Sequence, residues 1–356
     1  MKLIPAVFLG LGLLLPTPVW GQSVANEVGV GTTQTTPINP RSGYLYDRLI
    51  GVVDMAETVS LRLELVGTHD VATSPQHGAR FQLVGREIFA ASAALDWDLS
   101  KHFYLSAGGD FSPTSSTSSD APIQLGSTSV DALIHSTSNA YGLSARVGYD
   151  TAGDSDYETL VDGSLSLVHF SSRQSVMAVE SDGGPVPIQG VIDSCYLTQQ
   201  SGCDEYVNAA MQRDVDLNQY RVSASVTESI YQTTDLSLGG AYYWYDHDPR
   251  TLGYFSLATL GRTFAASAGL PSLAPLRYTL RPGLGHAFGP MRMDLWYQYG
   301  HYAYDEGHSH GGGLRLQYKF SRPVSAWLRF DGQDSVDHFG ATTISGLVVA
   351  GLRVRF

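Results

Sequence analysis

Apolar and polar residues alternate with a period of two along residues 314–320 and 324–330, and only Ser321, Arg322 and Pro323 separate the two segments. This alternation is typical of β-strands that meet a different environment on each face, and the short connection indicates a hairpin. After residue 15 the chain has no run of about 18 apolar residues, so a membrane-spanning helix is not expected.

The same unit recurs and predicts four further hairpins, with strands at residues 89–99 and 103–111, 141–149 and 161–170, 220–230 and 236–244, and 276–288 and 291–299. Single strands at 59–65 and 344–356 bring the expected total to twelve. Connections within hairpins are short and those between hairpins are long or polar, as in barrels with periplasmic turns and external loops. The sequence therefore predicts an all-β fold, a transmembrane antiparallel up-and-down barrel of about 12 strands. Fourteen strands is the alternative, if two more come from the long stretches.

The amino terminus is typical of a secretory signal peptide, with Lys2, an apolar run over residues 6–15, and Val19 and Gly21 before the expected cleavage point. We assign residues 1–21 to it. Residues 22–48 are polar and contain Pro37 and Pro40, so we expect a periplasmic N-terminal extension that could plug the lumen or touch a periplasmic partner. The barrel is then expected over residues 49–356, with residues 251–274 in an external loop.

The carboxyl terminus, residues 351–356, is an alternating strand that ends on Phe356. It resembles the last strand of Gram-negative outer-membrane proteins. The resemblance implies that the barrel assembly machinery reads Phe356 and that the protein resides in the outer membrane, in contact with its lipid. Tyr and Trp at strand ends, in residues 242–245 and 296–299, favour a membrane interface. A soluble β-sandwich with aromatic edges is the alternative.

The chain has a formal net charge of −12 and only 16% charged residues. An acidic chain without a basic block is a poor candidate for binding nucleic acid. The low charge density fits strands that turn one face to lipid.

With the apolar face of each strand assigned to lipid, the other face is assigned to the lumen. The expected basic, solute-binding residues of the lumen are Arg62, Arg146, Arg221, Arg277, Arg281, Arg292, Arg315, Lys319, Arg329, Arg353 and Arg355. The acids expected on the opposing wall are Asp96, Asp98, Asp110 and Asp162, and further lumen acids are Glu64, Asp294 and Asp331. Arg62 is expected to join the basic wall, because the first strand of a closed barrel pairs with the last.

This lumen predicts a channel for passive diffusion of small anionic solutes, since guanidinium groups bind carboxylate and phosphate through two parallel hydrogen bonds. The architecture is similar to that of arginine-lined monomeric porins with twelve strands that pass acidic oligosaccharides. Two alternatives stay open. The interior could be filled by Arg–Asp pairs, or the barrel could be a non-conducting outer-membrane part of a trans-envelope complex for polymer export or surface motility.

Other motifs are weaker. Cys195 and Cys203 are expected to form a disulfide in an exported protein. Histidines and carboxylates near residues 246–248 and 306–310 are interpreted as solvated loop tips, so no metal and no cofactor is expected. His135 and Ser138 are spaced to lie on opposite faces of a strand, unlike the His-x-Ser pair of outer-membrane phospholipases, so an enzyme is not expected.

Overall fold

The computed structural model describes residues 22–36, 42–70, 82–119, 123–125, 128–151, 157–181, 184–185, 187, 189–190, 193, 214–248, 276–303, 307–337 and 342–356. Within these ranges sixteen strands form a single antiparallel sheet. They are β1 (Gln22–Thr36), β2 (Ser42–Ala56), β3 (Val59–Asp70), β4 (Gln82–Asp98), β5 (Phe103–Ser119), β6 (Ile123–Leu125), β7 (Thr128–Asp150), β8 (Tyr157–Ser181), β9 (Gly184–Pro185), β10 (Asp214–Ile230), β11 (Thr234–Tyr245), β12 (Leu276–Phe288), β13 (Met291–Tyr302), β14 (Gly307–Lys319), β15 (Val324–Asp337) and β16 (Thr342–Arg355).

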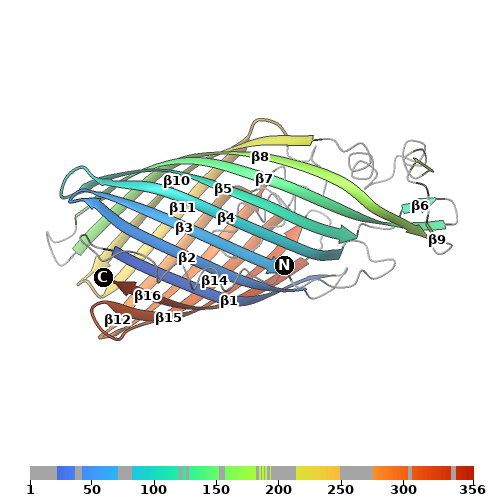
Figure 1. Cartoon of the computed structure of the whole chain (residues 1–356). Helices are drawn as coiled ribbons and strands as arrows, with labels where there is room; N and C mark the ends of the chain where they lie inside the picture. The colour runs from blue at the N-terminus through green and yellow to red at the C-terminus, as the bar shows by residue number, and fades with distance from the viewer. Residues whose placement is uncertain are drawn as a thin grey trace.

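The sheet closes on itself, because β1 pairs with β16 and β7 pairs with β8. The two short strands, β6 and β9, only extend the ladder beside β7 and β8. The closed barrel therefore has fourteen strands (Figure 1). The expected count of twelve is wrong, and the alternative of fourteen is confirmed.

The two additional strands are β1 and β2, so the periplasmic extension expected for residues 22–48 is also wrong. β1 pairs with β16 from Ser23 to Thr36 and with β2 from Gln22 to Thr33. Alternation is weak here because, apart from Glu27, the inward face of β1 carries mostly small residues and, apart from Arg48, that of β2 carries mostly apolar ones. The expected signal peptide, residues 1–21, lies outside the described residues.

All twelve strands expected from the pattern are present, and β12 has the expected bounds. Most of the other strands are longer than expected, and their additional residues lie at the end away from the short connections. β7 and β8 have 23 and 25 residues, against 13 and 12 in β12 and β13. One wall of the barrel therefore extends well past the rest (Figure 1). Residues 308–310, expected in a loop, belong to β14, and the expected loop 251–274 lies outside the described part of the chain.

The outer face of the barrel is an apolar belt. Exposed side chains along it include Val30, Leu63, Leu143, Leu165 and Leu352. Exposed aromatic residues border this belt near the strand ends, as Phe103 and Tyr149 do near the short connections. Contiguous apolar surface of this extent is rare on proteins that face water, and apolar bands with aromatic borders are typical of lipid-facing barrels. In the described ranges, no helix has the length and apolar character needed to cross a bilayer.

Candidate functional site

The inner face is identified by contacts that skip a strand. Glu27 on β1 contacts Trp327 and Arg329 on β15, although β16 lies between the two strands. Side chains from next-but-one strands approach each other most closely on the concave side of a curved sheet. Alternation along each strand then assigns the remaining side chains to the lumen or to the outside.

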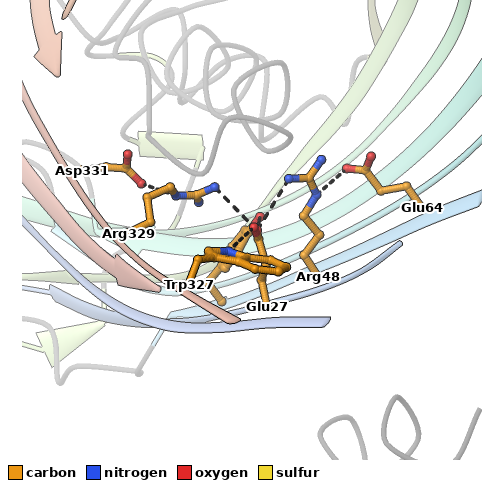
Figure 2. Close-up of polar contacts among 7 residues, drawn as sticks. Glu27, Arg48, Glu64, Trp327, Arg329 and Asp331 are labelled. Carbon is orange, nitrogen blue, oxygen red and sulfur yellow. Dashed lines mark hydrogen bonds and ion pairs between the residues drawn. The ribbon is translucent and has the colours of Figure 1, made fainter. Parts of the chain in front are cut away.

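Glu27 is the centre of a chain of alternating charges that crosses the seam between β16 and β1. Its Oε2 atom lies 3.5 Å from guanidinium nitrogens of both Arg48 and Arg329. Arg48 continues to Glu64 at 2.9 Å, and Arg329 continues to Asp331 at 2.8 Å. Figure 2 shows Glu27 between the two guanidinium groups. Only 4% of Glu27 is exposed, so its charge is compensated almost wholly by protein groups.

Glycine makes one contact in this network possible. Trp327, Gly351 and Glu27 occupy one row of the sheet, on β15, β16 and β1. The indole lies flat over Gly351, where any Cβ would overlap the ring, and its Nε1 donates to Oε1 of Glu27 at 3.0 Å. The ring therefore lies along the wall instead of standing into the lumen.

The same arrangement of aromatic residue, glycine and acid occurs on the opposite wall. Tyr104 lies over Gly148 and donates its hydroxyl hydrogen bond to Asp162, in one row across β5, β7 and β8. A third row places Trp296 over Gly313 beside Asp331. Rings that cover glycines on a neighbouring strand stabilise sheet positions that glycine alone would weaken.

Four of the expected lumen arginines are neutralised by carboxylates. Arg62 pairs with Asp96 at 3.4 Å and Arg146 with Asp162 at 2.7 Å. Arg292 pairs with Asp235 and, at 2.7 Å, with Asp294, and Arg329 pairs with Glu27 and Asp331. These pairs correspond to the filled-interior alternative, but they involve only part of the set.

Four other arginines lie against aromatic rings and make no ion pair with any described carboxylate. The Cζ atoms of Arg315 and Arg353 lie 4.6 and 5.9 Å from the ring centroid of Trp327. Arg281 lies 5.5 Å from that of Trp296, and Arg221 5.6 Å from that of Tyr243. Rings of this kind attract cations through their electron-rich faces and leave the guanidinium N–H groups free to donate.

The remaining predicted residues lie near the strand ends, except Asp110 in the middle of β5. Arg277 is at the register shift between Leu276 and Tyr278 on β12, and it is exposed. Lys319 and Arg355 are exposed near the short connections, as is Asp98. Asp110 is exposed on β5, with its carboxylate over Gly142.

The expected place of Arg62 is wrong. Its strand is β3, and β1 and β2 separate it from β16. Arg62 therefore belongs to the wall that carries Asp96, where it forms an ion pair, and it does not extend the basic wall of β12–β16.

The interior also contains residues that the sequence pattern missed. Glu27 and Arg48 lie on the two unrecognised strands, and Asp235 is the second residue of β11. Trp327 and Gly351 have no local signal, because their contact depends on the pairing of β15 with β16. In the sequence, the glycine is the feature that indicates such a row, and it does so only once the pairing places it opposite an inward aromatic residue.

Two buried apolar clusters also lie on the inner face. One contains Tyr46, Val66, Leu347 and Val349 on β2, β3 and β16, and the other contains Phe170 and its neighbours on β7, β8 and β10. The described interior is thus partly charged and partly apolar.

Three further predictions concern a catalytic pair, a disulfide and a metal site. His135 and Ser138 lie on opposite faces of β7, and Nδ1 of His135 is 3.3 Å from Oγ1 of Thr117. Cys195 and Cys203 fall outside the described residues. Across the described ranges, no three His, Cys, Asp or Glu side chains are grouped so that they could hold a metal.

The solved structures that resemble this chain agree on the class of its fold. No family model matches the sequence, and no curated protein matches it. A Pseudomonas aeruginosa FadL homologue is similar in structure with a TM-score of 0.56 at 11% identity, over 94% of this chain and 90% of that one. The Ralstonia pickettii toluene transporter TbuX gives 0.56 at 10%, over 95% and 90%. The CymD monoaromatic hydrocarbon channel gives 0.55 at 9%, over 95% and 89%.

The chain has the fold of a Gram-negative outer-membrane β-barrel. At these identities the likeness concerns the fold alone. The lumen chemistry of this barrel has to be argued from its own residues.

Proposed function

We propose that this barrel is inserted in the outer membrane and forms a channel for passive diffusion of small anionic solutes. The apolar belt on its outer face and its likeness to outer-membrane barrels support the location. Phe356 directly follows β16 and its side chain is exposed, which supports the further proposal that the barrel assembly machinery binds it.

The observation that carries the proposal is the group of Arg281, Arg315 and Arg353 on one wall of the lumen. They rest on Trp296 and Trp327 and have no described carboxylate within ion-pair distance. Guanidinium groups held against rings keep N–H donors available for a passing anion. Charged residues on a barrel's inner face set which ions pass most readily.

The neighbouring structures support the channel part of the proposal only. Their names describe a monoaromatic hydrocarbon channel and a toluene transporter. The anionic part rests on the arginines of this chain.

The test is single-channel recording of the purified full chain in a planar bilayer under a KCl gradient. We expect conductance steps and a reversal potential whose sign indicates that chloride passes more readily than potassium, because unpaired guanidiniums concentrate anions. Replacing Arg281, Arg315 and Arg353 together by Ser should reduce the anion preference. The matched control is the double variant Arg62→Ser and Asp96→Ser, which removes a neutralised pair without changing net charge. Absence of conductance, cation preference in the wild type, or equal effects of both variants would contradict the proposal.

A second candidate is passage of apolar solutes, favoured by the buried cluster of Tyr46, Leu347 and Val349. Thermal unfolding with and without toluene addresses it. A stabilisation by toluene that Val349→Ala abolishes would favour this candidate over the anion channel.

A third candidate is a non-conducting barrel that forms the outer-membrane part of a trans-envelope complex. Residues 22–36 and 42–48 form β1 and β2, so they are not a periplasmic arm that could bind a partner. The conductance measurement decides between this candidate and a channel.

A further inference from the structure

Two guanidinium groups share one indole ring in the basic wall. Arg315 and Arg353 approach Trp327 from β14 and β16, at 4.6 and 5.9 Å from the ring centroid. In the sheet, the direct neighbours of Trp327 are Gln317 and Gly351. The two arginines are therefore diagonal neighbours of the indole on either side of it.

Neither guanidinium is neutralised by a described carboxylate. Glu27 and Asp294 attract Arg315, whereas Arg353 and Arg329 repel it. Asp294 already forms an ion pair with Arg292 at 2.7 Å. Glu27 already accepts from Trp327 and lies at 3.5 Å from both Arg48 and Arg329. It has little capacity left for another cation.

Arg315 also has a hydrogen-bond donor, its buried Nε atom, that meets no acceptor among the described residues. A buried donor on a charged group is costly unless a ligand satisfies it. Two neighbouring positive charges with a free donor form a place where a bound anion would remove both costs.

We infer that Arg315 and Arg353 form a binding station for a small oxyanion that carries two negative charges, such as sulfate or phosphate. This inference rests on the proposed anion channel and names the class of solute that it holds best. Each guanidinium presents a planar fork of N–H groups that matches two oxygens of an oxyanion. A dianion satisfies two forks, whereas chloride offers neither the geometry nor the second charge.

The station is held in place by the wall behind it. The indole lies over Gly351 on one side and is hydrogen-bonded to Glu27. Both arginines are thereby supported before an anion arrives, which lowers the entropy lost on binding.

The experiment uses the purified full chain in two measurements. In planar bilayers with KCl, sulfate at increasing concentration and constant ionic strength should reduce the chloride current in a saturable way. In the double variant Arg315→Gln and Arg353→Gln, half-maximal block should need at least about tenfold more sulfate, since each lost interaction joins two charged groups. The matched control is Arg322→Gln, which removes an exposed arginine from the short connection between β14 and β15 and should leave the block unchanged.

The second measurement does not need conduction. The unfolding temperature in detergent, compared between sulfate and chloride at equal ionic strength, should rise more in the wild type than in the double variant. Any general stabilisation by sulfate acts equally on both. A chloride current without saturable block, together with equal temperature shifts, overturns the inference and leaves the anion channel standing. A sulfate shift specific to the wild type without any conductance supports the station and contradicts the channel.

Discussion

The indole N–H of Trp327 donates to the carboxylate of Glu27 at 3.0 Å, across 300 residues of sequence. The bond joins β15 to β1 over β16, at the seam where the barrel closes. Because Gly351 leaves room beneath the ring, the last two strands and the first are tied by one buried contact. Ion pairs from Glu27 to Arg48 and Arg329 strengthen the same seam.

Replacing Glu27 by Gln tests this seam. The amide can still accept from Trp327, but it no longer neutralises Arg48 and Arg329. We expect the free energy of unfolding to fall by about 1–3 kcal/mol, because both arginines keep a second carboxylate, Glu64 or Asp331. Urea titration followed by the heat-dependent shift in gel mobility measures it. We also expect a stronger anion preference in bilayers, since the lumen loses one negative charge.

Asp110→Asn is the matched control for that variant. It removes one exposed lumen carboxylate that makes no ion pair in the described part of the chain. If both variants shift the reversal potential and the urea midpoint equally, Glu27 has no special place in the network.

Gly351→Ala tests whether the flat indole needs glycine. The new methyl group would overlap the Trp327 ring, so the ring must move into the lumen and lose its bond to Glu27. We expect a loss of about 1–3 kcal/mol in the free energy of unfolding, as for overpacking elsewhere. Gly332→Ala, on the neighbouring strand, meets nothing within 4 Å and should change it by less than about 1 kcal/mol. Equal urea midpoints for the two variants would contradict the role of Gly351.

A double-mutant cycle tests the row on the opposite wall. Arg146 donates to both oxygens of Asp162, at 3.0 and 2.7 Å, and only 9% of Asp162 is exposed. We expect Arg146→Gln and Asp162→Asn to be coupled by about 1–3 kcal/mol in unfolding, because each single change leaves the other group unpaired.

The control cycle combines Asp162→Asn with Arg221→Gln. Arg221 lies opposite Ser166, four residues further along β8 than Asp162, and its guanidinium lies over the ring of Tyr243. Its change should add to that of Asp162 within about 0.5 kcal/mol. Coupling of similar size in both cycles would mean that the effect is not specific to the Arg146–Asp162 pair.

The sequence predicts most of the wall because hairpins are local. The bounds of β12 follow from alternation and from Gly289 and Pro290, where the glycine has a positive φ of 59° and the chain reverses at once. Arginines on the polar face of such strands are placed on the inner face by the same period of two. Their division into neutralised and ring-bound groups depends on contacts between strands, which the pattern does not contain.

Local sequence patterns could not predict the seam, where β1 pairs with β16. β2 has apolar residues on both faces, with Tyr44 and Tyr46 inward and Leu45 outward, so its alternation is hidden. Gly29 and Gly31 on β1 leave room for side chains from β16 and β2, and they look like part of a flexible tail when read alone. Arg62 was misplaced for the same reason, since its distance from β16 depends on two strands that the pattern missed.

A disulfide across the seam tests β1 as a barrel strand. Val28 on β1 and Ala350 on β16 are direct neighbours on the outer face. Opposed positions of antiparallel strands lie within disulfide reach. In a background where Cys195 and Cys203 are replaced by Ser, Val28→Cys with Ala350→Cys should cross-link on mild oxidation and change the mobility of the unfolded chain. Val28→Cys with Ile344→Cys is the control, because Ile344 pairs with Gln34 and lies several residues from Val28 along the ladder. If residues 22–36 were a free periplasmic arm, the two pairs would cross-link slowly and to the same extent.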